Sequence, residues 1–301
     1  MANWNQILDE INSKGSLYDT YRRQYLERIH EITGRNIIIY YSGWLQKGGN
    51  NLPLSISDMD KTGFMTTLHD LDHSKGLDLF LHTPGGESAA TESLVQYLRS
   101  LFGQDIRVFI PHMAMSAGTM IALSAKEIFM GKQSNIGPID PQFMGIPAHG
   151  IIEEFEQAKK DIAHNPASLP LWQVIISKYN PTLLGECQKA IEWSKEMVLN
   201  WLKNCMFSEL EQTEAETKAT NIVDFLSDHI LQKSHSRHID MEQAKGIGIV
   251  VRDLEENQEL QEAVMNLHYS CILTFEKTPA CKIIENHKGI AYISMPGNQG
   301  K

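Results

Sequence analysis

Residues 77–86 read LDLFLHTPGG, a short apolar run that stops abruptly at Pro84-Gly85-Gly86. The run predicts a buried strand over 77–82, and the proline and glycines predict a tight turn after it. The same rhythm continues in the chain, with strands predicted over 106–111 and 127–130 and an apolar-faced helix before each of them. Strands that alternate with helices in this way predict right-handed βαβ units and a mostly parallel sheet.

The flanking segments extend this α/β pattern in both directions. The first 35 residues predict an amphipathic helical segment, residues 36–41 (NIIIYY) a buried strand, and residues 57–72 a helix. After Gly145 the pattern becomes helical: Asn180-Pro181 predicts the start of a helix that runs to Met206, and Asp240 with Gln243 predicts a capped helix before a strand over 247–251. We therefore expect an N-terminal helical segment (1–35), a main domain (36–251) and a C-terminal extension (252–301), of which the last 40 residues have too weak a pattern to assign.

Composition excludes several classes of protein. The chain has 301 residues, of which 42% are hydrophobic and 21% charged, which is typical of a globular protein. Lys and Arg number 27 against 37 Asp and Glu, a net charge of −10 without any basic run, which argues against a general nucleic-acid binder. The four cysteines form no CxxC pair and predict free thiols in a reducing compartment. The sequence shows no signal peptide and no run of about 20 apolar residues, so we expect a soluble, cytoplasmic protein without membrane contact.

Two turns carry the groups that could do chemistry. In the first, Gly85 and Gly86 allow a positive φ and present bare N–H groups to a ligand, although such a turn on its own is often only a connection. In the second, residues 112–119 (HMAMSAGT) place Ser116 among small residues where a strand meets a helix, a position that would also suit a simple N-cap. Both turns should lie at the carboxyl edge of one sheet. There the amides of Gly86 and Ala117 can converge on one oxygen beside Ser116, as acyl transfer requires.

Three motifs in this order resemble a known group of enzymes. TPGG (83–86), MAMSAGT (113–119) and SNIGPIDPQ (134–142) are similar to the Clp/crotonase superfamily of serine peptidases, and the last is most similar to the serine dehydrogenase proteinase family, related to signal peptide peptidase A. The resemblance covers residues 36–145 well, and 181–206 and 235–251 loosely. It implies a spiral of βα units with a mostly parallel sheet and helical C-terminal additions. It also implies Ser116 as nucleophile, an oxyanion hole of Gly85, Gly86 and Ala117, a protein or peptide substrate, no cofactor and a homo-oligomer.

The general base departs from the Clp pattern. Clp peptidases carry a histidine about 25 residues after the serine, where this chain reads GPIDP (137–141) without histidine. Signal peptide peptidase A uses a lysine instead, and the matching zone here is 172–189. Lys178 is the first candidate because its neighbours are apolar, and burial can lower a lysine pKa from about 10.4 so that the amine is neutral. A solvated surface lysine is the alternative.

Other residues could also serve. His149, Lys189 and Tyr179 are further candidates for the base, and Asp140, held between two prolines, could orient the turn or the substrate. His235 and His238 could seat a zinc ion, but no carboxylate or cysteine accompanies them at metal-ligand spacing. We therefore expect no metal site, and expect the C-terminal histidines (His229, His235, His238, His268 and His287) to support the loop before Asp240 through hydrogen bonds.

The sequence thus predicts a serine endopeptidase that works through an acyl-enzyme with a Ser–Lys dyad. One alternative is a Clp-fold interaction scaffold that has lost its base. A crotonase-type acyl-CoA enzyme is a further alternative; it would need a cationic patch for phosphates and an acid–base carboxylate pair, and the acidic balance and the MSAGT motif (115–119) argue against it.

Overall fold

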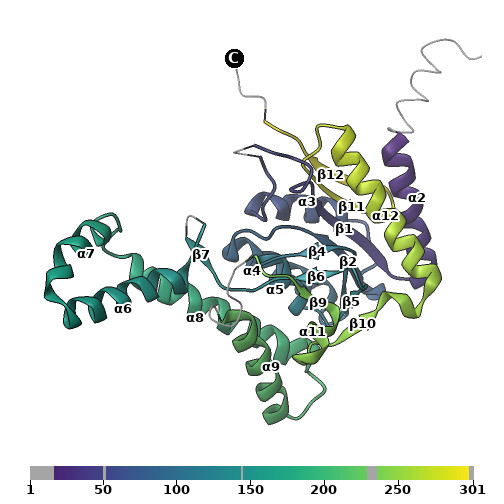
Figure 1. Ribbon diagram of the computed structural model, residues 1–301. Coiled ribbons are helices and arrows are strands. Elements are labelled where there is room, and N and C mark those ends of the chain that lie inside the picture. Colours follow the sequence, from purple (N-terminus) through teal and green to yellow (C-terminus); the bar gives the residue numbers. More distant parts are fainter. Residues whose placement is uncertain (1–16, 50–51, 144, 229–235, 298–301) are drawn as a thin grey trace, which may run out of the picture.

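The computed structural model describes residues 17–49, 52–143, 145–228 and 236–297. Its centre is a seven-stranded sheet in the order β10-β5-β3-β2-β1-β11-β12 (Figure 1). The first five strands in this order are parallel to one another, whereas β11 and β12 are antiparallel additions. The bounds are β1 Asn36–Ser42, β2 Leu77–His82, β3 Ile106–Ile110, β5 Glu127–Met130, β10 Val251–Asp253, β11 Lys282–Asn286 and β12 Ala291–Ser294.

Helices cover both faces of the sheet because its strands are apolar on both sides. Ile37 and Ile39 of β1 face one core, with α2 (Leu17–Thr33) and α12 (Gln258–Lys277). Ile38 and Tyr40 face the other core, with α3 (Asp58–Leu68), α4 (Ser88–Phe102) and α5 (Ala117–Leu123). Such strands read as continuous apolar runs, which is why β1, β2, β3 and β5 could be predicted almost to the residue.

Two predictions for the C-terminal part need correction. The strand expected over 247–251 lies at Val251–Asp253 instead, because the amides of Ile247, Gly248 and Ile249 bond back to the end of α11 (Met241–Gly246). The last residues, which had no assignable pattern, form α12, β11 and β12, and β11 pairs with β1. The mixed α/β fold with a mostly parallel sheet is confirmed, and its C-terminal additions are strands as well as a helix.

A smaller sheet lies across the carboxyl ends of the central strands. It contains β4 (Met113–Ala114), β6 (Asn135–Ile136) and β9 (Ile239–Asp240) in that order. After β3 the chain therefore leaves the main sheet, and it joins the smaller sheet as β4 just before Ser116. This change of sheet places Ser116 at the carboxyl edge of the parallel strands.

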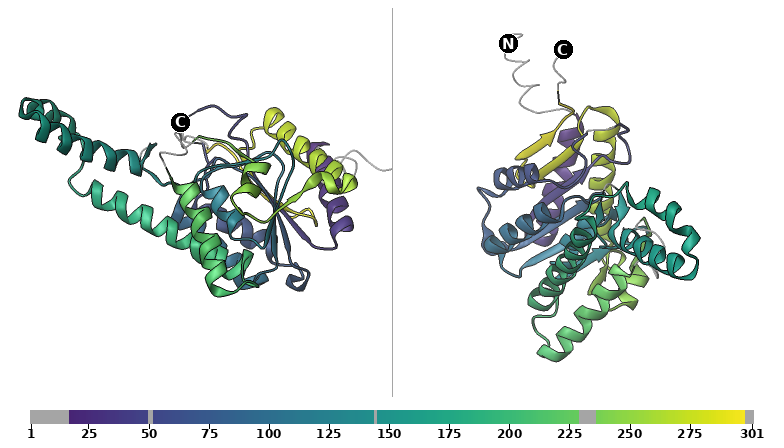
Figure 2. Two further views of the ribbon diagram at one scale, coloured as in Figure 1. Left: turned by 60° about the horizontal axis from the view of Figure 1, so that its bottom comes forward. Right: turned by 90° about the vertical axis from the view of Figure 1, so that its left-hand side faces the viewer.

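An arm (residues 142–193) projects from the body (Figures 1 and 2). It consists of the hairpin β7–β8 (Gln142–Phe143 and Ile146–Pro147), α6 (Ala148–His164), a short 3-10 turn (Pro166–Ser168), α7 (Leu169–Ile176) and the first half of α8 (Leu183–Trp201). The helix predicted from Asn180 begins later, after Thr182, and continues as a π-helical turn (Leu202–Met206) before α9 (Gln212–Ser227). The stripe predicted to be buried on it is buried: Cys187, Ile191, Val198, Leu202 and Cys205.

Candidate active site

Backbone hydrogen bonds join the two glycine- and serine-containing turns side by side. The Thr83 amide donates to the Met113 carbonyl (3.1 Å), and the Met115 amide donates to the Thr83 carbonyl (3.0 Å). Thr83 and Ala114 thereby form a parallel bridge. Because β2 leads directly into one turn and β3–β4 into the other, the sheet itself fixes the distance between them.

Ser116 has an unusual backbone. Its φ of 51° and ψ of −117° make it the one non-glycine residue with positive φ among the described parts of the chain. A non-glycine residue in such a region costs on the order of 1–3 kcal/mol and is typical of active sites. Its side chain makes no capping hydrogen bond to α5, so Ser116 is not an ordinary N-cap. The hydroxyl is left half-buried at the start of a buried helix.

Gly85 and Gly86 are required for different reasons. Gly85 has a φ of 98°, and a Cβ there would lie 2.8 Å from the Ser116 Cβ. Gly86 lacks the positive φ that the sequence suggested; a Cβ there would lie 2.3 Å from the Ile56 backbone. Ile56 donates to the Gly85 carbonyl (2.8 Å) and accepts from the Glu87 amide (3.0 Å). Ile56 thus bonds to the residues before and after Gly86 and not to Gly86 itself. As in a regular pair of strands, the Gly86 amide therefore points away from Ile56.

The Ala117 amide lies close to the same turn. Its nitrogen would be 3.0 Å from a Cβ placed on Gly85, and as the first residue of α5 it has no hydrogen-bond acceptor within the helix. The structure therefore brings Gly85, Gly86, Ser116 and Ala117 together, as the sequence led us to expect. Their joint action as an oxyanion hole stays a prediction.

A cleft of about 700 Å³ opens over these residues. Gly85, Gly86 and Ser116 line one side, and Asp140, which is buried, lies in the lining with them. Apolar side chains supply much of the remaining wall: Met120, Ile139, Phe143 and Trp193. Trp193, 39% exposed, comes from α8 and Phe143 from β7, so the root of the arm forms part of the cleft. This volume and lining suit a peptide with an apolar side chain.

The candidate bases do not reach the cleft of a single chain; among the described residues that line it there is no lysine or histidine. Lys178 follows α7, which lies at the far end of the arm (Figure 1), and it is exposed rather than buried by its apolar neighbours. Lys189 is exposed and paired with Glu186 (3.1 Å). His149, partly buried, lies in the first turn of α6.

Tyr179 belongs to the internal packing of the arm. It donates a hydrogen bond to Glu154, which raises the pKa of the Tyr179 phenol, and its ring packs on Phe155. A phenol with a raised pKa stays protonated near neutral pH and is a poor base. The structure thus gives Tyr179 a packing role in the arm.

Histidines lie behind the two turns, on the α12 side of the sheet, and the sequence analysis missed two of them. His82 ends β2, His112 follows β3, and His268 comes from α12, with ring centroids 5.4–5.6 Å apart. Burial, with smaller repulsion from its histidine neighbours, lowers the pKa of His82 to about 3, and burial lowers that of His268 to about 4. His268 therefore packs at the sheet edge, and His287 stacks on His30, rather than supporting the loop before Asp240. His229 and His235 lie outside the described residues.

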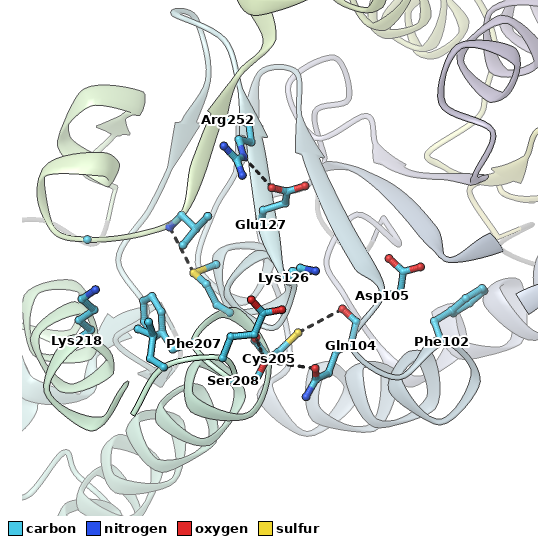
Figure 3. Close-up of a pocket in the computed structure, with 15 residues that line it drawn as sticks. Phe102, Gln104, Asp105, Lys126, Glu127, Cys205, Phe207, Ser208, Lys218 and Arg252 are labelled. Carbon is cyan, nitrogen blue, oxygen red and sulfur yellow. Dashed lines mark hydrogen bonds and ion pairs between the residues drawn. The ribbon is translucent and has the colours of Figure 1, made fainter. Parts of the chain in front are cut away.

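A second cavity, of about 630 Å³, lies at the opposite edge of the sheet (Figure 3). Lys126 and Gln104, which line it, come just before β5 and β3, whereas Ser116 follows the other ends of these strands. Arg252 pairs with Glu127 (2.8 Å) in its wall, and the Cys205 thiol donates to the Gln104 carbonyl (3.6 Å). Ser208, Lys126 and Lys218 also line this cavity, but none of them adjoins a strained glycine- and serine-containing turn like the one at Ser116, so we assign the chemistry to the cleft at the carboxyl edge.

The described residues contain no group of three or more His, Cys, Asp or Glu that could hold a metal ion. Within the same residues, every helix is too short or too polar to cross a membrane.

Comparison with known proteins adds an independent observation. A family model described as ClpP-like SDH-type serine proteinase matches residues 54–279. Two uncharacterized proteins of Methanocaldococcus jannaschii are similar: MJ0137, 30% identical over 192 residues (64% of this chain and 59% of that protein), and MJ1495, 37% identical over 128 residues (42% and 39%). The chain thus matches less than two thirds of the length of either relative.

Solved structures show more distant likenesses. Two variants of the 1510-N membrane-bound stomatin-specific protease, one with a substrate peptide, are both 19% identical, with TM-scores of 0.38 and 0.37. The matches cover 67% and 65% of this chain and 77% and 70% of those chains. The family match, in contrast, spans well over half of the chain and includes Ser116 and both turns. The chain belongs to the ClpP-like SDH-type serine proteinase family.

Proposed function

We propose that this protein is a serine endopeptidase in which Ser116 is the nucleophile. The observation that carries the proposal is the strained backbone of Ser116, held against Gly85 and Gly86 in an open cleft. Strain of this kind is retained where it directs a side chain at a substrate. The apolar part of the cleft would take a side chain of a protein or peptide substrate, and no cofactor is needed.

The proposed reaction proceeds through an acyl-enzyme. Ser116 Oγ attacks the peptide carbonyl carbon and gives its proton to a neutral amine, while the carbonyl oxygen becomes an oxyanion that accepts from the Gly86 and Ala117 amides. The intermediate collapses when the C–N bond breaks and the leaving amine takes that proton. Water, deprotonated by the same base, then attacks the ester and releases the second product.

We propose Lys178 as this base, supplied by a neighbouring copy in a homo-oligomer. Lys178 is exposed and shortly follows α7, which lies at the far end of the arm that projects from the body (Figures 1 and 2), an arrangement compatible with action in trans. Burial lowers the pKa of a lysine, so docking of the arm against another copy would favour the neutral amine that the reaction requires.

The composition of α7 supports a partner at the arm. Its eight residues, LPLWQVII, include no buried side chain; Leu171 is 63% and Val174 61% exposed. Monomeric proteins rarely expose a contiguous apolar patch of this kind unless another surface covers it. A second copy is the partner we propose, since the same oligomer would bring Lys178 near a Ser116.

A fluorophosphonate probe tests the nucleophile directly. The wild-type protein should be labelled at Ser116, and Ser116→Ala should not be labelled. Ser88→Ala is the matched control, because Ser88 also lines the cleft but lies in the first turn of α4. Equal labelling of the wild type and Ser116→Ala would exclude Ser116 as nucleophile.

Complementation tests the base. Ser116→Ala and Lys178→Met should each be inactive, and co-expression of the two should restore part of the activity, because a mixed oligomer contains an intact Ser116 facing an intact Lys178. Failure of the mixture while each variant still assembles would contradict action in trans. If the wild type also fails to react with the probe, the lack of a base in the cleft of one chain favours the second candidate function, a non-catalytic interaction scaffold.

We further propose that the protein works in the cytoplasm. All four cysteines are unpaired thiols and buried, as is usual in a reducing compartment. Fractionation of cells with an antibody against the chain would test this placement; recovery from an oxidising compartment would contradict it.

A further inference from the structure

A buried charged network lies beneath the Gly85-Gly86 turn, outside the groups that the proposed reaction uses. Lys282 of β11 donates to both carboxylate oxygens of Asp60 (2.7 and 2.9 Å), and the Tyr40 hydroxyl donates to the same carboxylate (2.9 Å). Lys282 is 1% and Asp60 2% exposed, and Tyr40 is fully buried. The three side chains come from β11, α3 and β1, so three separate elements meet at this point.

The network holds the backbone of residues 54–57. The Lys282 ammonium also donates to the Ser55 carbonyl (2.8 Å), and the Asp60 carboxylate accepts from the Ser57 amide (2.9 Å). Ser42, the last residue of β1, donates to the Leu54 carbonyl (2.7 Å). Residues 54–57 have no regular strand of their own on this side, so these bonds from buried side chains determine where the segment lies.

Residues 54–57 in turn hold the turn that presents the Gly86 amide. Ile56 bonds to the Gly85 carbonyl and to the Glu87 amide, and its backbone fills the space where a Gly86 side chain would be. A second route leads from Tyr40, which shares a hydrogen bond with the Thr83 hydroxyl, and that hydroxyl accepts from the Gly85 amide (3.2 Å). The first route ends at the two peptide units that flank Gly86, and the second ends one peptide earlier, at the Gly85 amide.

The chemistry of the network favours a role in positioning over one in stability. A buried ion pair loses much of its attraction to desolvation, and well-packed apolar residues in its place are often as stable. Burial lowers the pKa of the Lys282 ammonium, and Asp60 partly offsets this effect. Lys282 and Asp60 instead form directed hydrogen bonds with Ser55 and Ser57, which apolar residues could not make.

We infer that Lys282, Asp60 and Tyr40 are positioning residues that fix residues 54–57 and thereby aim the Gly86 amide at the oxyanion. The inference deepens the proposed function and rests on it for its catalytic part. Its structural part, that the network immobilises the turn, holds independently of any reaction.

Two sets of variants test the network. The double variant Lys282→Met/Asp60→Asn removes both charges together, so no lone charge stays buried, and Tyr40→Phe removes a single hydroxyl. The matched control is Arg22→Met/Glu285→Gln. Arg22 and Glu285 form a fully buried pair (2.5 Å) on the opposite face of the same strand, where they do not contact the turn.

Amide hydrogen exchange gives the readout that needs no activity. In Lys282→Met/Asp60→Asn, and to a smaller extent in Tyr40→Phe, exchange at Ile56 and Glu87 should become about tenfold faster or more, while exchange at Thr83 and Met115 stays unchanged. The control pair should leave all four amides unchanged. Unaltered exchange at Ile56 and Glu87 in both variants, or equal acceleration in the control, would overturn the inference.

Kinetics give the second readout. The double variant should lower kcat by about tenfold to a hundredfold with little change in KM, because misdirection of one oxyanion donor affects the transition state more than substrate binding. The control should leave kcat intact. Faster exchange with an unchanged kcat would overturn the catalytic part. If the wild type hydrolyses no peptide, the proposed function has failed, and exchange alone decides whether the network positions the turn.

Discussion

The turns around Ser116 and the tip of the arm differ in how many of their contacts a single chain supplies. Around Ser116, the single chain supplies each contact: backbone bridges join the turns, and buried side chains support them from below. At α7 the single chain fully buries no side chain, although six of the eight residues are Leu, Ile, Val or Trp. For the dyad that we propose, the surroundings of Ser116 are therefore complete within one chain, and those of Lys178 are not.

The largest effect is expected for Ser116→Ala. Loss of the nucleophile should lower peptide hydrolysis by roughly 10⁴-fold or more, since removal of a catalytic serine removes covalent catalysis. The fold should persist, because the change deletes one half-buried hydroxyl that caps nothing. Turnover of a fluorogenic peptide and the denaturation midpoint are the measurements. Retained turnover in the purified variant would contradict the assignment.

Lys178→Met should be almost as inactive, because nucleophile and base act as a unit. Lys178→Arg should be as inactive as Lys178→Met, since a guanidinium stays protonated at any working pH and cannot act as a base. Lys189→Met is the control: Lys189 is also exposed on the arm but pairs with Glu186, and its loss should leave turnover within about twofold. Normal activity of Lys178→Met would make Lys178 a surface residue and direct attention to His149.

Gly86→Ala should lower kcat by on the order of 10²-fold. The added Cβ would lie 2.3 Å from the Ile56 backbone, so the turn must shift and its amide with it. Gly185→Ala, on the arm, is the matched control, because a Cβ there meets nothing within 4 Å. Steady-state kinetics separate the outcomes: a change confined to KM would assign Gly86 to substrate docking.

The smallest effect at neutral pH is expected from the histidines behind the turns. Burial lowers the folded-state pKa of His82 to about 3 and of His268 to about 4, below about 6.5 in an unfolded chain. Their contribution to stability is therefore full above pH 6.5 and is lost as the pH falls toward 4, where the unfolded state binds more protons. Urea midpoints between pH 7 and 4 should fall less steeply for His268→Gln than for the wild type. Identical slopes would contradict this account.

The sequence was most informative where a local pattern determines the structure. Continuous apolar runs predicted β1, β2, β3 and β5, and two short motifs predicted that Ser116 and the glycines meet at one edge. Strand β11 was not predicted because Lys282 and Glu285 are residue types usual at surfaces. Their buried ion-pair partners, Asp60 and Arg22, are more than 200 residues away in sequence.

The surroundings of Lys178, in contrast, could not be predicted from the sequence. Its apolar neighbours suggested a buried lysine, and for a single chain that expectation is wrong, since Lys178 is exposed and no side chain of α7 is fully buried. Apolar sequence indicates that a surface will be covered, but it does not say which molecule covers it.

The root of the arm has a mechanical consequence. Phe143 and Trp193 line the cleft, and Phe143 also packs in the small core that joins α6 to α8. α6 has 17 residues and is therefore about 25 Å long. It connects the tip of the arm to the wall of the cleft at Phe143. A tilt of the arm would therefore move Phe143 and Trp193 and change the width of the cleft. A partner bound at the tip of the arm would then influence the opening that a substrate must enter.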